Sequence, residues 1–186
     1  MSEQIIFLNK YADLEPDQIS HAFRGLINNP ETREEALKSK FYNPSSDEIH
    51  QLLDRPETSI RARILKHMNV DPEHIERGLN DPSYDVRMSA ANNRNATSVQ
   101  IFKALRDPSE YVRARAALNP SATDKHRDLA VDDPGLAPQS IVANHHKITK
   151  NQMVRLLKSK YKMVQENVKM NPKYFEYFPN GHEGLI

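Results

Sequence analysis

Three arginines recur at one position of a repeated stretch, and they are the first side chains here that could do chemistry. Arg61, Arg87 and Arg113 stand 26 residues apart, so one guanidinium per unit could track the phosphates of a nucleic acid. The spacing also suits internal ion pairs, because Asp81 and Asp107 stand six residues before Arg87 and Arg113. Charge-assisted hydrogen bonds of this kind hold neighbouring units in register. We therefore predict a structural ladder of Asp81, Arg87, Asp107 and Arg113, in which each arginine pairs with the acidic residue of its own or the neighbouring unit.

Basic side chains outside this ladder are the candidates for binding a partner. Residues 137–186 hold 3 acidic and 8 basic side chains, whereas residues 1–56 hold 10 and 6. Aromatic residues lie among the C-terminal lysines, and this combination can bind a nucleic-acid backbone and stack bases. The same residues can instead cap the open end of a stack of units. The candidate partner-binding residues are Arg63, Arg94, Arg115, Lys147, Lys150, Arg155, Lys158, Lys160 and Lys162.

No combination of residues predicts a catalytic, cofactor or metal site. The chain has no cysteine, which excludes thiolate metal ligands and thiol nucleophiles. His145 and His146 are adjacent, so their side chains are expected to point apart, whereas helical metal ligands stand three or four residues apart. We predict a protein that is not an enzyme and binds no cofactor.

Prolines mark the units that must position these side chains. Five of the 12 prolines recur every 26 residues, and four of the five follow an asparagine or an aspartate. Aspartate and asparagine are good N-caps and proline suits the first helical turn, so a helix is predicted to begin at each of these prolines. They are Pro30, Pro56, Pro82, Pro108 and Pro134.

A second column of N-cap residues stands fifteen positions after each proline and predicts a second, shorter helix in every unit. Apolar residues four and eight positions later form one stripe on that helix. The fourth unit departs from this pattern, since Arg127 replaces the expected isoleucine and Leu129 and Val131 are predicted to carry the stripe. The N-cap column is Ser45, Asp71, Thr97, Thr123 and Thr149.

The first helix of each unit has small residues near its end, at Ala91, Ala117 and Ala143, where neighbouring helices can approach closely. Asparagine tolerates a left-handed cap conformation, so these helices are predicted to end at asparagines. The predicted caps are Asn92, Asn119 and Asn144.

Two stretches resemble known helical repeats. DPSYDVR (81–87) and DPSEYVR (107–113) resemble the Asp-Pro-x-x-x-Val-Arg signature of HEAT-type repeats. The run VRARAALNPSAT (112–123) and its short period are still more similar to the leucine-rich repeat variant family. The resemblance covers residues 55–158 and implies an α-helix alternating with a shorter, partly 3₁₀ helix. The iron–sulfur segment of some family members needs cysteines, which this chain lacks. The predicted fold class is all-α, a right-handed α-solenoid of about five 26-residue two-helix repeats.

We predict one domain, because one unit buries its apolar face only by stacking on others. Residues 1–28 are an N-terminal cap and half-repeat, 29–158 five repeats, and 159–186 a degenerate last repeat with a basic, aromatic C-terminal cap. The sequence shows no signal peptide and no long apolar span, so we expect a cytoplasmic protein without membrane contact. The oppositely charged ends also allow head-to-tail self-association.

The leading functional hypothesis is a non-enzymatic scaffold that recognises another protein through the surface formed by successive helices. The alternative is nucleic-acid binding through the basic C-terminal third. A third, less favoured, is an enzyme of the DNA glycosylase type, because some HEAT-like proteins act on alkylated bases. Such a site needs an acidic residue in an aromatic-lined hollow. The repeats offer few aromatic side chains, such as Tyr84, Phe102 and Tyr111, and the chain has no tryptophan.

Overall fold

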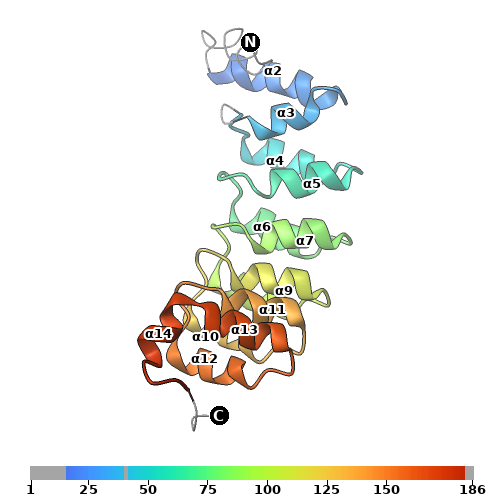
Figure 1. The fold of residues 1–186 in the computed structure, drawn as a ribbon. Helices are drawn as coiled ribbons and strands as arrows, with labels where there is room; N and C mark the ends of the chain where they lie inside the picture. Colours follow the sequence, from blue (N-terminus) through green and yellow to red (C-terminus); the bar gives the residue numbers. More distant parts are fainter. Residues whose placement is uncertain (1–15, 40–41, 183–186) are drawn as a thin grey trace.

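The computed structural model describes residues 16–39 and 42–182, and the regular secondary structure within these ranges is entirely α-helical. The helices follow one another along a single stack, with the described ends of the chain at opposite ends of it (Figure 1). The predicted all-α class is therefore confirmed for this part of the chain. Residues 1–15 of the predicted N-terminal cap lie outside the described residues. The helices are α2 (Pro16–Asn28), α3 (Arg33–Lys38), α4 (Ser46–Leu53), α5 (Thr58–Ile64), α6 (Pro72–Leu79), α7 (Tyr84–Ala91), α8 (Ser98–Ala104), α9 (Glu110–Ala117), α10 (Asp124–Val131), α11 (Leu136–Ala143), α12 (Lys150–Leu157), α13 (Lys162–Met170) and α14 (Pro172–Tyr177).

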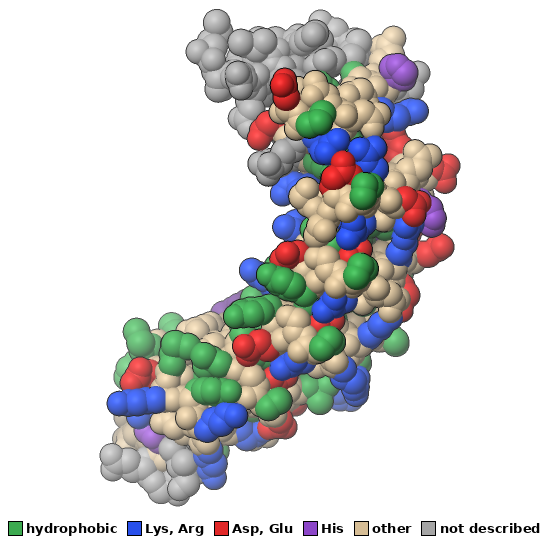
Figure 2. Space-filling view, turned by 90° about the vertical axis from the view of Figure 1, so that its right-hand side faces the viewer, with side chains coloured by type: hydrophobic (Ala, Val, Ile, Leu, Met, Phe, Trp, Pro, Cys, Tyr) green, Lys and Arg blue, Asp and Glu red, His purple; other side chains and the backbone are tan. Residues whose placement is uncertain are grey.

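The helices form two rows. The helices α3, α5, α7, α9 and α11 follow the recurring prolines, and together with α13 they form what we call the inner row. The other helices form the outer row. Inner-row neighbours pack directly on one another, as α7 does on α5 and α9. The side chains at these contacts are small. The buried residues there include Ala90, Ala91, Ala116, Ala117 and Ala143. Close packing in this row bends the stack into an arc, with the inner row on its hollow side (Figures 1 and 2).

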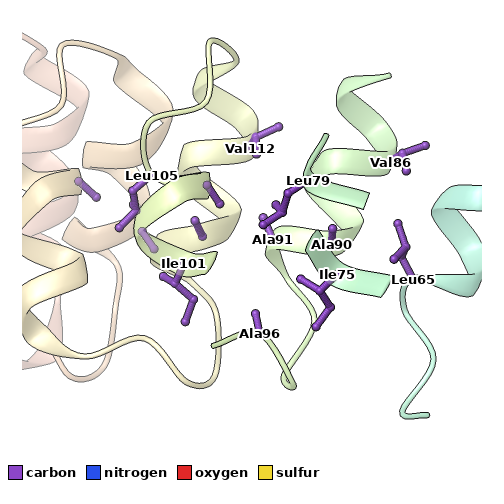
Figure 3. Packing of buried hydrophobic residues seen from close by; sticks show 14 of the residues in the cluster. Leu65, Ile75, Leu79, Val86, Ala90, Ala91, Ala96, Ile101, Leu105 and Val112 are labelled. Carbon is purple, nitrogen blue, oxygen red and sulfur yellow. The ribbon is translucent and has the colours of Figure 1, made fainter. Parts of the chain in front are cut away.

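The core lies between the two rows. Outer-row residues Ile75 and Ile101 and inner-row residues Val86 and Val112 are each 0% exposed. Side chains of both rows point into this space in Figure 3. Gly78 permits the closest approach, because a Cβ there would lie 2.5 Å from Leu65 Cδ1. The isoleucine and valine positions expected from the repeat are therefore the core positions.

The predicted N-caps of the outer helices are confirmed. The caps of α4, α6, α8, α10 and α12 are Ser45, Asp71, Thr97, Thr123 and Thr149. The third residue of these helices also reaches back to the preceding unit. Gln100 Nε2 donates to Pro72 O at 2.6 Å, and Gln152 Nε2 donates to Asp124 O at 3.3 Å. The capping residues thus fix helix starts and tie neighbouring units together.

The inner helices begin later than predicted. The helices α7 and α9 begin at Tyr84 and Glu110, two residues after their prolines, and their N-caps are Ser83 and Ser109. Asp81 does not cap the helix. Its carboxylate accepts the N–H of Ser83 at 2.8 Å and also binds an arginine from another unit. The aspartate and proline therefore form a turn before the helix.

The predicted left-handed caps are wrong. Asn92 and Asn144 end α7 and α11 with φ of −89° and −90°, and no described non-glycine residue has a positive φ. The cap of α9 is Leu118. Asn119 follows it, buried, and its side chain forms hydrogen bonds between units instead of ending a helix.

Candidate functional site

Arginine–aspartate pairs run along one edge of the stack, which we call the ladder edge. Arg87 donates through Nε and Nη2 to the two carboxylate oxygens of Asp107, at 2.7 and 3.1 Å. Its Nη1 donates to the carbonyls of Asp81 and Pro82 at 3.0 Å. Arg61 with Asp81 and Arg113 with Asp133 repeat the arrangement. Acidic and basic side chains are interspersed down this edge, which faces the viewer in Figure 2. Each arginine pairs with an aspartate of the next unit, so the ladder side chains are already engaged in contacts within the protein.

The last described rung of this ladder is neutral. Gln139 stands 26 residues after Arg113, and its Nε2 donates to Asp133 O at 2.7 Å. Ser159 stands 26 residues after Asp133, and its hydroxyl donates to Gln139 Oε1. An amide–hydroxyl pair thus replaces the ion pair. This rung is not among the contacts predicted above, although extending both columns by one period predicts it.

The rung between Arg61 and Asp81 makes the fold sensitive to acid. Burial alone would raise the pKa of Asp81, but hydrogen bonds from Arg61 and the Ser83 N–H outweigh it and hold the pKa below its usual value. A carboxyl of lowered pKa stabilises the fold above its unfolded pKa of about 3.9, and this contribution is lost as the pH falls through the folded pKa. We expect urea denaturation to give a steady unfolding free energy from about pH 7 to 5 and a falling one below about pH 4. Asp81→Asn should flatten this fall, whereas substitution of the exposed Asp85 should not; equal profiles would contradict the prediction.

A column of asparagines ties the units together along the opposite edge, which we call the asparagine edge. Asn93 Nδ2 donates to Leu65 O at 2.7 Å and to His67 O at 3.1 Å, and its Oδ1 accepts the Asn95 N–H at 2.8 Å. Asn119 and Asn171 make the same three kinds of bond. Each asparagine of this column thus links its own unit to the preceding one through the same side-chain hydrogen bonds.

A groove runs beside the asparagine edge. It consists of two adjoining hollows, of about 610 and 740 Å³, which share Pro120 in their walls. The ends of the inner helices and the loops that follow them supply most of the lining. The first hollow reaches from the end of α3 to Pro120, and the second lies between the loops after α9 and α11. The groove therefore crosses several units on one side of the molecule.

The charged groups that line the groove are all basic among its described residues. Arg63, Lys66 and Arg94 line the first hollow and Lys147 the second, and none of these four pairs with a described carboxylate. Arg115 is exposed at the position in its unit that Arg63 holds in its own. The structure thus brings predicted binding residues of four successive units to one side.

The other candidate residues do not join them. Lys158 and Lys160 are exposed on either side of Ser159, at the ladder edge. Arg155 is committed to ion pairs with two aspartates. Lys150 lies over the ring of Phe178, 5.4 Å from its centroid. Lys162 is exposed at the start of α13. The C-terminal basic residues are therefore divided between the two edges and do not form one surface.

The expectation for the paired histidines is wrong. The rings of His145 and His146 stack, with centroids 4.6 Å apart and planes at 24°, and both line the second hollow.

Leu129 is 40% exposed, so it does not carry the stripe of α10 as predicted; Ala130 and Val131 do. Arg127 is buried in the column where isoleucine was expected, and it too lines the second hollow.

The C-terminal aromatics divide between core and surface. Tyr174 and Phe178 are buried at the end of the stack, whereas Phe175 is 69% exposed.

Across residues 16–39 and 42–182, no helix combines the length and apolar character needed to cross a membrane. Comparisons with family models, with curated proteins and with solved structures found no match to this chain.

Proposed function

We propose that the chain is an α-solenoid of 26-residue units, of the HEAT-like or leucine-rich repeat variant type, acting as one domain. Recurrence of the same contacts in successive units supports this. The bonds from Arg61, Arg87 and Arg113 recur at one separation along the chain, and so do those from Asn93 and Asn119. Each contact joins a unit to its neighbour, as in repeat proteins whose stability resides in nearest-neighbour interfaces.

As its function, we propose non-enzymatic recognition of another protein, through an acidic, extended segment that lies in the groove. The observation that carries this is the charge of the groove. Four basic side chains of its described lining, Arg63, Lys66, Arg94 and Lys147, have no carboxylate partner among the described residues, and the lining contains no acidic residue. Met68 and Leu118 add apolar surface between the cations. An acidic segment with some apolar side chains complements both features.

The spacing of the units favours an extended peptide. Packed helices lie about 8–10 Å apart, and an extended chain advances about 3.3 Å per residue. A carboxylate at about every third residue would therefore meet one unit after another. Nucleic acid fits less well, because the described groove lining contains no tyrosine or phenylalanine on which bases could stack.

Fluorescence anisotropy tests the proposal with labelled peptides of about 15 residues that carry glutamate at every third position. We expect binding at least about tenfold tighter than for the same peptides with glutamine, since several partly exposed ion pairs together supply about 1.4 kcal/mol. Charge reversal at Arg63 and Arg94 should remove this preference. Charge reversal at Lys158 and Lys160 is the matched control and should preserve it, because those lysines lie at the other edge.

Equal affinity for the glutamate and glutamine peptides would overturn the proposal. A labelled single-stranded oligonucleotide is titrated in parallel at two salt concentrations. Tight binding that weakens steeply with salt, and that is lost on charge reversal at Lys158, Lys160 and Lys162, would establish the nucleic-acid alternative.

A further inference from the structure

The second hollow of the groove is lined by an arginine that departs from the apolar column of its repeat and by a histidine. Arg127 occupies the column held elsewhere by Ile75, Ile101 and Met153, all 0% exposed. His145 occupies the column held by asparagine in the third, fourth and last units and by His67 in the second. Both Arg127 and His145 line the same hollow, of about 740 Å³. A buried cation in an apolar column therefore meets a histidine at one place.

Arg127 is buried without full hydrogen bonding. The residue is 4% exposed. Its Nη1 donates to Ala122 O at 2.9 Å and its Nη2 binds Asp124 at 2.5 Å. Its Nε is buried and has no partner among the described residues. A buried N–H without an acceptor is unfavourable, and a charged group is worse placed than the isoleucine that the column otherwise uses. The fold keeps a buried cation with one unsatisfied N–H where an apolar residue would pack.

His145 does not make the contacts between units that the asparagines of its column make. An asparagine in this column binds two carbonyl oxygens of the preceding unit, as Asn119 does with Ala91 and Asn93. Within the described ranges, the His145 ring makes only one hydrogen bond, in which Nδ1 accepts the Lys147 N–H at 3.0 Å. The ring of His145 therefore donates no hydrogen bond to the preceding unit within these ranges.

Positive charge in this hollow exceeds what its neighbours neutralise. The pKa of His145 lies below its usual value, first because the ring is partly buried and then because the charge of Arg127 opposes its protonation. His146 and Lys147 act in the same direction, and Asp124 alone opposes them. A bound dianion would reverse this balance, because it would favour the protonated form of His145.

We propose that this hollow is a binding site for a phosphate monoester. Guanidinium groups bind phosphate oxygens through directed N–H bonds, and a lysine adds a point charge. The second ionisation of a phosphate monoester has a pKa of about 6, so the ester carries close to two negative charges at pH 7 and complements the cations of the hollow. The ester is either a free metabolite or a phosphorylated side chain. This proposal stands apart from the proposed peptide binding, since its test uses a small molecule alone.

Isothermal titration calorimetry of the full chain with O-phosphoserine tests the site, with inorganic phosphate and acetate in parallel. We expect saturable binding of O-phosphoserine and at least about tenfold weaker binding of acetate. Arg127→Ile restores the residue of the column and should fold at least as stably while it loses binding by about tenfold or more. His145→Asn should also weaken binding. Lys125→Met, on the exposed face of the same helix, is the control and should bind as the parent does.

Two further measurements complete the test. Binding of O-phosphoserine should raise the NMR-titrated pKa of His145, a change that a merely structural Arg127 would not produce. A phosphoserine peptide that binds more tightly than O-phosphoserine would identify a protein side chain as the source, and equal affinity would identify a free monoester. Absence of O-phosphoserine binding, or equal binding by a folded Arg127→Ile chain, would overturn the proposal.

Discussion

Replacing Arg113 with alanine is expected to lower the free energy of unfolding by about 2–4 kcal/mol. The guanidinium donates to both oxygens of Asp133, at 2.6 and 2.9 Å, and to the carbonyls of Asp107 and Pro108. The side chain of Asp133 is 7% exposed, so the substitution would leave a mostly buried carboxylate without its counter-charge, with the Gly135 N–H as its remaining hydrogen-bond donor among the described residues. Urea denaturation at pH 7 measures the loss.

The chain contains its own controls for this experiment. Arg115→Ala removes an exposed arginine two positions away and should change stability by less than about 0.5 kcal/mol. The double variant Arg113→Gln, Asp133→Ser copies the neutral rung of Gln139 and Ser159. We expect it to recover much of the loss, because no buried charge is then left unpaired. A double variant no more stable than Arg113→Ala would refute this account of the ladder.

Replacing Asn119 with alanine should lower the free energy of unfolding by a similar amount, about 2–4 kcal/mol. The side chain is 3% exposed and makes three hydrogen bonds of 2.8 Å, donated to Ala91 O and Asn93 O and accepted from the Ser121 N–H. Alanine would leave all three groups without this partner, and the two bonds to Ala91 O and Asn93 O are buried. Each unsatisfied buried group costs about 1–3 kcal/mol before the structure relaxes.

Thermal denaturation followed by circular dichroism compares this variant with Asn92→Ala. Asn92 caps α7 but is exposed, so its loss should change stability by less than about 0.5 kcal/mol. If the two substitutions prove equally mild, the asparagine edge contributes nothing to the joining of the units.

How well the sequence predicts a helix start depends on how far away the capping partner lies. Thr97 is predictable as an N-cap, because it bonds to the N–H of Gln100 in the first turn of its own helix. Asp81 has the same local appearance before Pro82, yet Arg61 binds its carboxylate from twenty residues earlier. Sequence patterns describe the first kind of contact and not the second. The helices α7 and α9 therefore begin two residues later than their prolines suggest.

The candidate site follows the same rule. The free cations Arg63 and Arg94 are identifiable from sequence, because they fall outside the ladder column. Their position beside one groove depends on where the inner helices end in space, which no single unit specifies. Arg127 was visible as an exception to the apolar stripe. The sequence of one unit cannot predict that Arg127 lines the same hollow as His145, because the two residues come from different units.

Because the rung of Gln139 and Ser159 is neutral, the contacts at the two ends of the molecule respond differently to acid. The rungs of Arg61, Arg87 and Arg113 each pair a guanidinium with an aspartate carboxylate. The pKa of Asp81 is lowered, so the stability that its rung contributes is lost in acid. An amide and a hydroxyl do not titrate in this range. The contact between α11 and α13 thus keeps its side-chain hydrogen bond in acid. The Arg61–Asp81 contact between units is therefore expected to weaken in acid before the contact between α11 and α13 does.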